Sequence, residues 1–144
     1  MKVAIIGCGL IGKKRLSSLQ KDDILVACCD TNPDLSFDCK FYTNYKDLID
    51  NCDCDAVIIS VVNKYAKEIV EYALNHKKHV LVEKPMGVNY KEAVSMYNIS
   101  QNKEIILNVG FNLRFHPAIL EAKNLQKTIG KTIIIRGVYG HGGR

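Results

Sequence analysis

Three glycines near the N-terminus constrain the fold more than any other feature of this chain. They are Gly7, Gly9 and Gly12, and they follow directly on the apolar run Val3-Ala4-Ile5-Ile6. The residues after them, Lys13 to Leu19, are typical of a helix. A strand, a glycine turn and a helix in this order are the context in which a G-x-G-x-x-G pattern indicates a dinucleotide-binding turn.

Each position of this turn has its own expected task. Gly7 permits the tight turn off the strand, Gly9 lets a pyrophosphate approach the backbone, and Gly12 lets the helix pack closely on the sheet. The helix is expected to begin near Leu10. The backbone N–H groups of Leu10 and Ile11, at the positive end of the helix dipole, would then face the phosphates.

Asp30 predicts which dinucleotide is bound. It ends a second apolar run, Ile24 to Cys29, and lies 18 residues beyond Gly12. The acid that hydrogen-bonds the adenine ribose is expected about 20 residues beyond the glycines. A carboxylate repels a 2′-phosphate, and the residues that follow, Thr31-Asn32-Pro33, include no Arg to neutralise one. The sequence therefore favours NAD over NADP. The alternative is a plain strand-to-helix turn, with Asp30 as an ordinary turn residue.

Apolar runs and amphipathic segments alternate along the rest of the chain. This repeat predicts an α/β protein with a doubly wound parallel sheet, the Rossmann dinucleotide-binding fold. Further strands are expected at residues 40–42, 55–61, 79–82 and 104–109. Helices are expected at 44–50, 65–75 and 90–101, the last with Asn89 as its N-cap, and another helix should begin at His116-Pro117.

The last segment breaks this pattern. The β-branched run Lys131 to Tyr139 predicts a strand, and a glycine-rich stretch follows it. We therefore expect residues 1–128 to form the dinucleotide-binding domain. Residues 129–144 would be the start of a truncated C-terminal α/β substrate domain.

Composition excludes several classes of protein. The formal net charge of +5 is spread along the chain without a basic and aromatic stripe, so no nucleic-acid partner is expected. No apolar run approaches the length of a membrane span, and a cytoplasmic location is expected. The six cysteines have no zinc or disulfide spacing, so we expect no metal and mostly buried, reduced thiols. Cys8, within the glycine turn, is a candidate oxidation-sensitive thiol.

Glu83-Lys84-Pro85 follows the strand expected at 79–82. Ligands of open α/β sheets bind at the carboxyl ends of the strands. Pro85 restricts Lys84 to an extended conformation, and Lys84 could assist deprotonation of a substrate hydroxyl. The alternative is a surface lysine before a turn proline.

These motifs together resemble the glucose-fructose oxidoreductase, inositol dehydrogenase and MocA family. The resemblance rests on the glycine turn, on Asp30 and on the stretch from His79 to Met86, and it extends over essentially the whole chain. It implies hydride transfer between a nicotinamide and a hydroxyl-bearing carbon of a sugar, sugar-nucleotide or cyclitol. Lys84 would then be the catalytic residue, with Glu83 and Pro85 beside the cofactor.

The resemblance also implies a substrate side and a homo-oligomer for the full-length protein. It implies Asn112 and Arg114 as substrate-side candidates, and the Lys84–Pro85 peptide bond is expected to be cis. His141 is a further substrate-side candidate because it lies in the glycine-rich stretch. The chain departs from the family at Val61, Val62 and Ala66, where a Thr-Pro pair and a His are common. It also has no D-x-x-x-H pattern, the family's principal acid/base, so this fragment alone is expected to be inactive. The alternative is a non-catalytic NAD-binding regulatory module.

Overall fold

The computed structural model describes residues 1–101, 104–138 and 140, and it divides into two compact units, Met1–Gly110 and Phe111–Arg144. The first unit alternates strands and helices: β1 (Lys2–Ile6), α1 (Leu10–Leu16), β2 (Ile24–Cys29), β3 (Lys40–Tyr42), α2 (Tyr45–Asn51), β4 (Ala56–Ile59), α3 (Asn63–Asn75), β5 (His79–Val82), α4 (Tyr90–Gln101) and β6 (Leu107–Val109). The second unit contains a 3-10 helix, η1 (Asn112–Phe115), and α5 (Pro117–Leu125).

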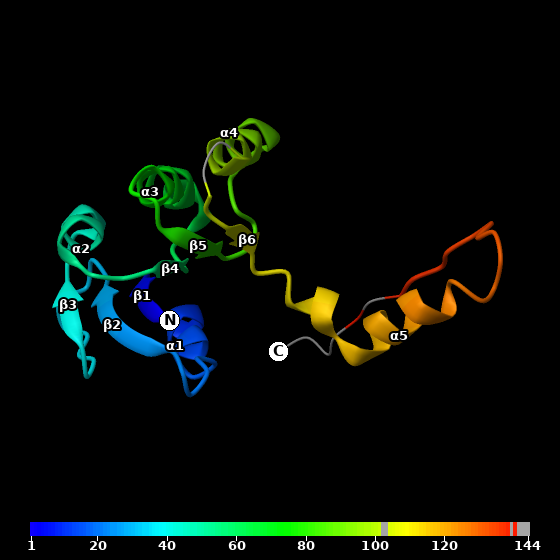
Figure 1. Ribbon diagram of the computed structural model, residues 1–144, viewed down its shortest axis with the longest axis horizontal. Helices are drawn as coiled ribbons and strands as arrows, with labels where there is room; N and C mark the ends of the chain where they lie inside the picture. The colour runs from blue at the N-terminus through cyan, green and yellow to red at the C-terminus, as the bar shows by residue number, and fades with distance from the viewer. Residues whose placement is uncertain (102–103, 139, 141–144) are drawn as a thin grey trace. The chain divides into compact units, whose positions relative to one another are not determined.

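The six strands form one parallel sheet in the order β3-β2-β1-β4-β5-β6 (Figure 1). Chain order reverses between β1 and β4, which is the strand order of a Rossmann fold and confirms the predicted fold class. The strands end in register, because Ile6 lies opposite both Cys29 and Ile59, and Ile59 lies opposite Val82. Segments that follow these strands therefore meet along one edge of the sheet.

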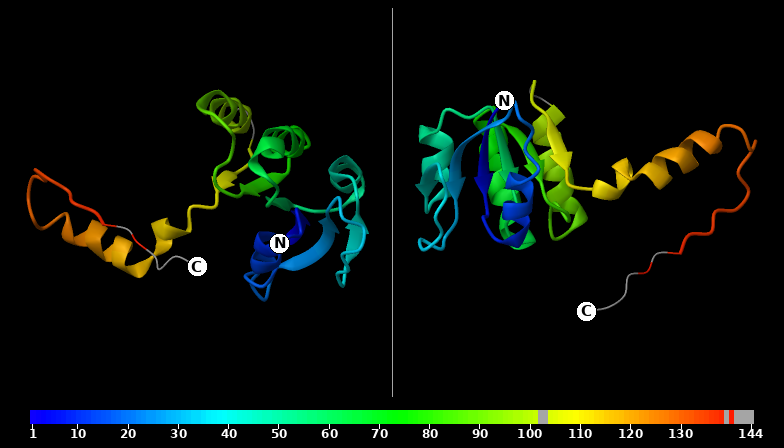
Figure 2. Two further views of the ribbon diagram at one scale, coloured as in Figure 1. Left: turned by 180° about the vertical axis from the view of Figure 1, so that it is seen from behind. Right: turned by 90° about the horizontal axis from the view of Figure 1, so that it is seen from below.

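Helices cover both faces of this sheet (Figures 1 and 2). The larger core joins α2, α3 and α4 to Ala4, Ile6 and Cys29, whereas the smaller core joins α1 to the opposite face, which carries Ile5 and Cys28. Buried residues at successive positions of β1 and β2 explain why these strands are continuous apolar runs. Cys28 and Cys29 point to opposite faces because side chains alternate along a strand.

Helix starts follow local side-chain chemistry. The Asn89 side chain accepts the backbone N–H of Glu92 at 3.0 Å, which confirms the predicted cap of α4. Asn44 accepts the N–H of Lys46 at 2.9 Å and caps α2 in the same way. His116 precedes α5, whose first residue is Pro117, as the sequence predicts.

The strand predicted at Lys131 to Tyr139 is wrong for the residues that the structure describes. Residues 131–138 form no strand, and Ile133, Ile134, Ile135 and Val138 are 81–89% exposed. A strand needs a neighbour to pair its backbone N–H and C=O groups, and this segment has none among the described residues. Tyr139 lies outside them. The predicted domain boundary after residue 128 stays a prediction, while the compact first unit ends at Gly110.

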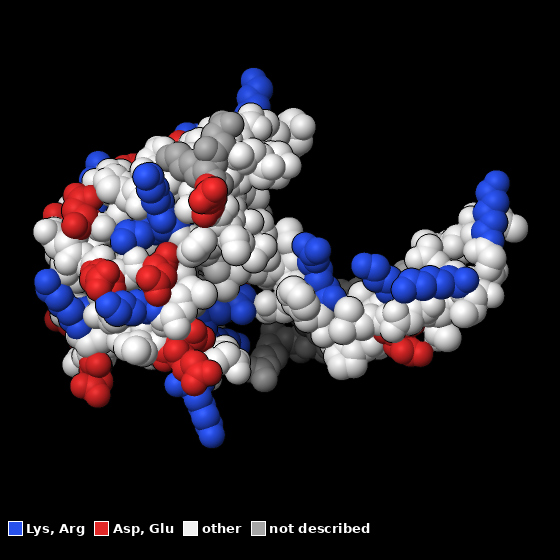
Figure 3. Space-filling view, in the orientation of Figure 1, with Lys and Arg blue, Asp and Glu red and all other residues white. Residues whose placement is uncertain are grey.

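Basic and acidic side chains are interspersed on the face of the first unit that Figure 3 shows. Several of them pair, such as Lys2 with Asp53 and Lys67 with Glu71. Within the described part of the chain, no helix is long and apolar enough to cross a membrane. The same residues contain no group of three or more His, Cys, Asp or Glu that could hold a metal ion.

Candidate functional site

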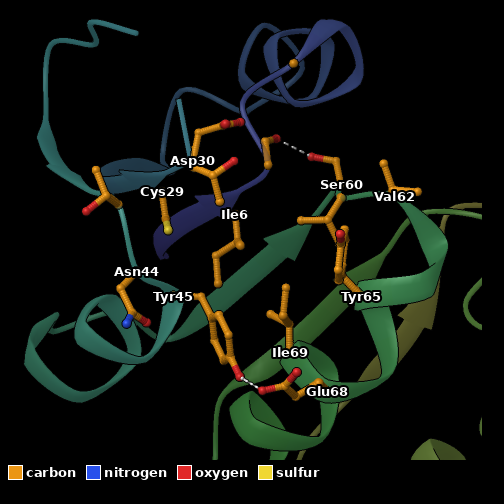
Figure 4. Close-up of a pocket in the computed structure, with 15 residues that line it drawn as sticks. Ile6, Cys29, Asp30, Asn44, Tyr45, Ser60, Val62, Tyr65, Glu68 and Ile69 are labelled. Atoms are coloured by element: carbon orange, nitrogen blue, oxygen red, sulfur yellow. Dashed lines mark hydrogen bonds between the residues drawn. The ribbon is translucent and has the colours of Figure 1, made fainter. Parts of the chain in front are cut away.

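A cavity of about 600 Å³ opens where β1, β2 and β4 end (Figure 4). This is the point at which the strand order reverses, where ligands of open α/β sheets bind. The start of α2 and one face of α3 complete its wall. The residues that line it are Ile6, Gly7, Gly9, Cys29, Asp30, Thr31, Thr43, Asn44, Tyr45, Ser60, Val61, Val62, Tyr65, Glu68 and Ile69.

Gly7 holds the glycine turn against the ends of two neighbouring strands. Its N–H donates to the carbonyl of Cys29 at 2.8 Å, and its carbonyl accepts the Ser60 hydroxyl at 2.7 Å. Its φ of 89° is in the left-handed region, and a Cβ here would lie 2.7 Å from the Ser60 backbone. Both the conformation and the space therefore require glycine.

Gly12 and Gly9 differ in their surroundings. A Cβ on Gly12 would lie 2.0 Å from the carbonyl oxygen of Gly7, so α1 packs directly on the turn. A Cβ on Gly9 would meet no atom within 4 Å. Leu10 and Ile11, the first residues of α1, are 72% and 42% exposed. The space above Gly9 is therefore open to a ligand, while the space beside Gly12 is filled by the protein.

The Asp30 carboxylate lies at the rim of the cavity with a fixed orientation. One oxygen accepts the backbone N–H of Cys8 at 2.7 Å, and the other accepts that of Asn32 at 3.0 Å. Each oxygen has a second lone pair for a ligand donor. The carboxylate predicted at the end of β2 is thus held by the glycine turn itself.

Cys8 is only 1% exposed, with its thiol within the smaller core. A hydrogen bond from the Cys28 thiol lowers the pKa of Cys8. On the cavity side of the sheet, burial raises the pKa of Cys29 to about 12, so this thiol stays protonated.

The Glu83-Lys84-Pro85 segment lies at the end of β5. The Glu83 N–H donates to the carbonyl of Ile59 at 2.9 Å, which ties the segment to the end of β4. Lys84 is exposed, and the Lys84–Pro85 peptide bond is cis, as the resemblance implies.

Arg15 of α1 forms an ion pair with Glu83, and the two side chains are 20% and 15% exposed. A Cβ on Gly110 would lie 2.9 Å from both side chains. This pair therefore joins the helix after the glycine turn to the segment that carries Lys84.

We expect Arg15→Met to lower the free energy of unfolding by about 1–2 kcal/mol, because it leaves the shielded Glu83 carboxylate without its charged partner. The matched control is Lys14→Met on the exposed side of the same helix, for which a change within about 0.5 kcal/mol is expected. Urea denaturation followed by circular dichroism measures both. Adding Glu83→Gln to Arg15→Met should recover part of the loss. Equal free energies of unfolding for Arg15→Met and Lys14→Met would contradict the prediction.

The substrate-side candidates lie outside the first unit. Asn112 and Arg114 belong to η1 of the second unit. His141 lies outside the described residues. Their assignment to the substrate side stays a prediction.

Sequence reasoning missed four residues of this region: Ser60, Tyr45, Glu68 and Arg15. Ser60 carried a usable signal, since it directly follows the apolar run of β4. The other three lie on helices that are far apart in the sequence. Tyr45 and Glu68 meet through the packing of α2 on α3, whereas Arg15 of α1 meets Glu83 at the end of β5.

The glycine turn, the reversed strand order and the cavity between them define a Rossmann dinucleotide-binding domain. The sequence model of the GFO_IDH_MocA oxidoreductase family, described as an NAD-binding Rossmann fold, matches residues 1–111. The chain therefore belongs to this family, and the matched part is its NAD-binding domain. This confirms the resemblance drawn from the motifs.

Known relatives agree with this assignment. A myo-inositol 2-dehydrogenase of Thermotoga maritima is 30% identical over 147 residues, which cover 94% of this chain and 44% of the relative. The crystal structure of myo-inositol 2-dehydrogenase from Lactobacillus plantarum matches with a TM-score of 0.81 and 30% sequence identity. The match covers 92% of this chain and 43% of the chain of that dehydrogenase.

The structure of scyllo-inositol dehydrogenase from Lactobacillus casei with bound NAD(H) and scyllo-inositol is 26% identical, with a TM-score of 0.80. The match covers 90% of this chain and 42% of the chain of that dehydrogenase. This chain thus spans less than half the length of each of these three relatives.

Proposed function

We propose that this chain is the cofactor-binding part of an oxidoreductase that transfers hydride between NAD and a sugar, sugar-nucleotide or cyclitol. The observation that carries the proposal is the cavity between the glycine turn and Asp30, in a chain whose family is defined by an NAD-binding fold. Relatives that act on inositols support a polyol as the substrate. The regulatory-module alternative has no specific observation in its favour.

The proposed roles follow the site's geometry. The open backbone at Gly9, with Gly7, Leu10, Ile11 and Gly12 around it, would receive the pyrophosphate. Asp30 would accept hydrogen bonds from the adenine ribose.

Lys84 would face the substrate beside the nicotinamide, with Glu83 and Pro85 fixing its segment. Asn112, Arg114 and His141 are proposed for the substrate side. When bound, NAD supplies the hydride-accepting ring, and Lys84 assists proton transfer at the substrate hydroxyl.

The preference for NAD over NADP is supported by charge. None of the residues that line the cavity is basic, and two of them, Asp30 and Glu68, are carboxylates. A 2′-phosphate placed beside Asp30 would meet a like charge with no guanidinium or ammonium group in the wall to offset it. We therefore expect NADH to bind at least about tenfold more tightly than NADPH. In NADPH the phosphate replaces the 2′-hydroxyl that would donate a charge-assisted hydrogen bond to Asp30.

Asp30→Ala is expected to weaken NADH binding by roughly 10- to 100-fold, because it removes charge-assisted hydrogen bonds to the ribose. Titration of nicotinamide fluorescence with NADH and NADPH measures both affinities. The control is Asp38→Ala, an exposed acid of the same loop that does not line the cavity. NADH binding that Asp30→Ala leaves intact would contradict the assignment. An absence of NADH binding by the unaltered chain would overturn the proposed function itself.

A further inference from the structure

The end of the cavity away from Asp30 is closed by a contact between α2 and α3. The Tyr45 hydroxyl donates to Oε1 of Glu68 at 2.5 Å, and Figure 4 shows this pair opposite the glycine turn. The Tyr45 ring packs edge-on against Tyr72, with 5.7 Å between the ring centres. Tyr45 is therefore held by packing, and through its hydroxyl it orients Glu68.

The direction of this hydrogen bond follows from the pKa of Tyr45. Burial raises that pKa, and the hydrogen bond to Glu68 raises it further, so the phenol is neutral and donates. Oε1 of Glu68 accepts this hydrogen bond and lies 3.9 Å from the Lys46 ammonium. Among the described residues, no donor contacts the other oxygen, Oε2. An ionised carboxylate oxygen can only accept, so Oε2 is available for a donor on a ligand.

The wall between the two carboxylates is apolar. Ile6 and Ile69, which are 2% and 6% exposed, lie between Asp30 and the Tyr45–Glu68 pair (Figure 4). Val61 and Val62 add to the same wall. A flat heteroaromatic base suits such a surface, since its faces are apolar and its edge carries the polar groups. With its ribose at Asp30, the base would present its outer edge to Glu68.

We infer that Glu68, oriented by Tyr45, selects adenine through the 6-amino group of the base. This inference rests on the proposed binding of a dinucleotide in the same cavity. Adenine places an N–H donor at its 6-position, which complements Oε2. Hypoxanthine and guanine place a carbonyl there, so two acceptors would face each other. The pair thus makes the cavity specific for the base, in addition to the selection against a 2′-phosphate at Asp30.

The test compares NADH with reduced nicotinamide hypoxanthine dinucleotide, in which a carbonyl replaces the 6-amino group of the base and the adjacent N1 carries a hydrogen. Both are followed by nicotinamide fluorescence on this chain. We expect NADH to bind about fivefold more tightly, a small ratio because the Glu68 side chain is 69% exposed. Glu68→Gln should bring the two affinities within about twofold, because an amide can turn its N–H₂ toward a carbonyl.

Two further variants complete the test. Tyr45→Phe keeps the ring packing but removes the donor that orients Glu68, and it should also reduce the preference for NADH. Glu104→Gln makes the same charge change on an exposed residue outside the cavity and should leave the preference unchanged.

Equal affinities of the unaltered chain for the two dinucleotides, or a preference retained by Glu68→Gln, would overturn the inference and leave the proposed function standing. Binding of neither dinucleotide would overturn both.

Discussion

Replacing Gly12 with alanine is expected to lower the free energy of unfolding by about 2–4 kcal/mol. The added Cβ would lie 2.0 Å from the carbonyl oxygen of Gly7 and 3.1 Å from the Ser60 hydroxyl. The carbonyl cannot retreat without loss, because it accepts the Ser60 hydroxyl at 2.7 Å. Alanine gains about 1 kcal/mol of helix propensity over glycine, which offsets only part of this overlap. Urea denaturation followed by circular dichroism measures the loss.

Gly9→Ala is the matched control, because it adds the same methyl group to the same turn. A Cβ there meets nothing within 4 Å, so the stability should change by less than about 0.5 kcal/mol. The methyl group would instead occupy the space proposed for the pyrophosphate, and NADH affinity should fall by about tenfold or more. A stable Gly12→Ala protein would show that α1 is not packed on the turn. Undiminished NADH binding by Gly9→Ala would remove the proposed phosphate position.

Lys84→Ala is expected to lower kcat by about 100-fold or more, the usual contribution of a general acid or base. The dissociation constant for NADH should change by less than about twofold, because Lys84 does not line the cofactor cavity. The two quantities separate because Lys84 follows β5, whereas the cavity wall comes from the ends of β1, β2 and β4 and from α2 and α3. The assay follows reduction of NAD on addition of a polyol, with myo-inositol as one of those tried, in a protein that carries this domain together with a substrate-binding domain.

The control for Lys84 is Lys91→Ala, an exposed lysine on α4 that does not line the cavity. It should leave both kcat and the NADH dissociation constant unchanged. Equal losses of kcat and of NADH affinity in Lys84→Ala would argue against a catalytic role, since they would point to a disturbed cofactor site. A kcat close to that of the unaltered protein would assign the proton transfer to another residue.

Much of the fold could be predicted from residues close together in the sequence. The bounds of β3, β5 and α4 agree with the prediction, because each apolar run or amphipathic segment is bounded by polar or turn residues. The predicted runs at 55–61 and 104–109 are longer than β4 and β6. Apolar residues continue beyond the point at which neighbouring strands pair, so composition overestimates strand length.

The segment at 131–138 shows the limit of this reasoning. Its β-branched residues have the composition of a strand, yet β propensity describes how well a residue suits a pleated, half-buried surface rather than an intrinsic backbone preference. Without a paired neighbour the same residues remain exposed and irregular. The β-branched composition therefore predicted a strand where residues 131–138 form none.

By itself, the sequence determined the parts of the site that depend on local backbone geometry. The positive φ at Gly7, the start of α1 at Leu10 and the position of Asp30 at the end of β2 all follow from a few adjacent residues. Only the tertiary structure decided what surrounds them. Parallel pairing of β1 with β4 brings Ser60 to Gly7, 53 positions apart, and helix packing brings Tyr45 to Glu68. Such contacts have no local pattern, because their energy depends on strand order and packing across the whole unit.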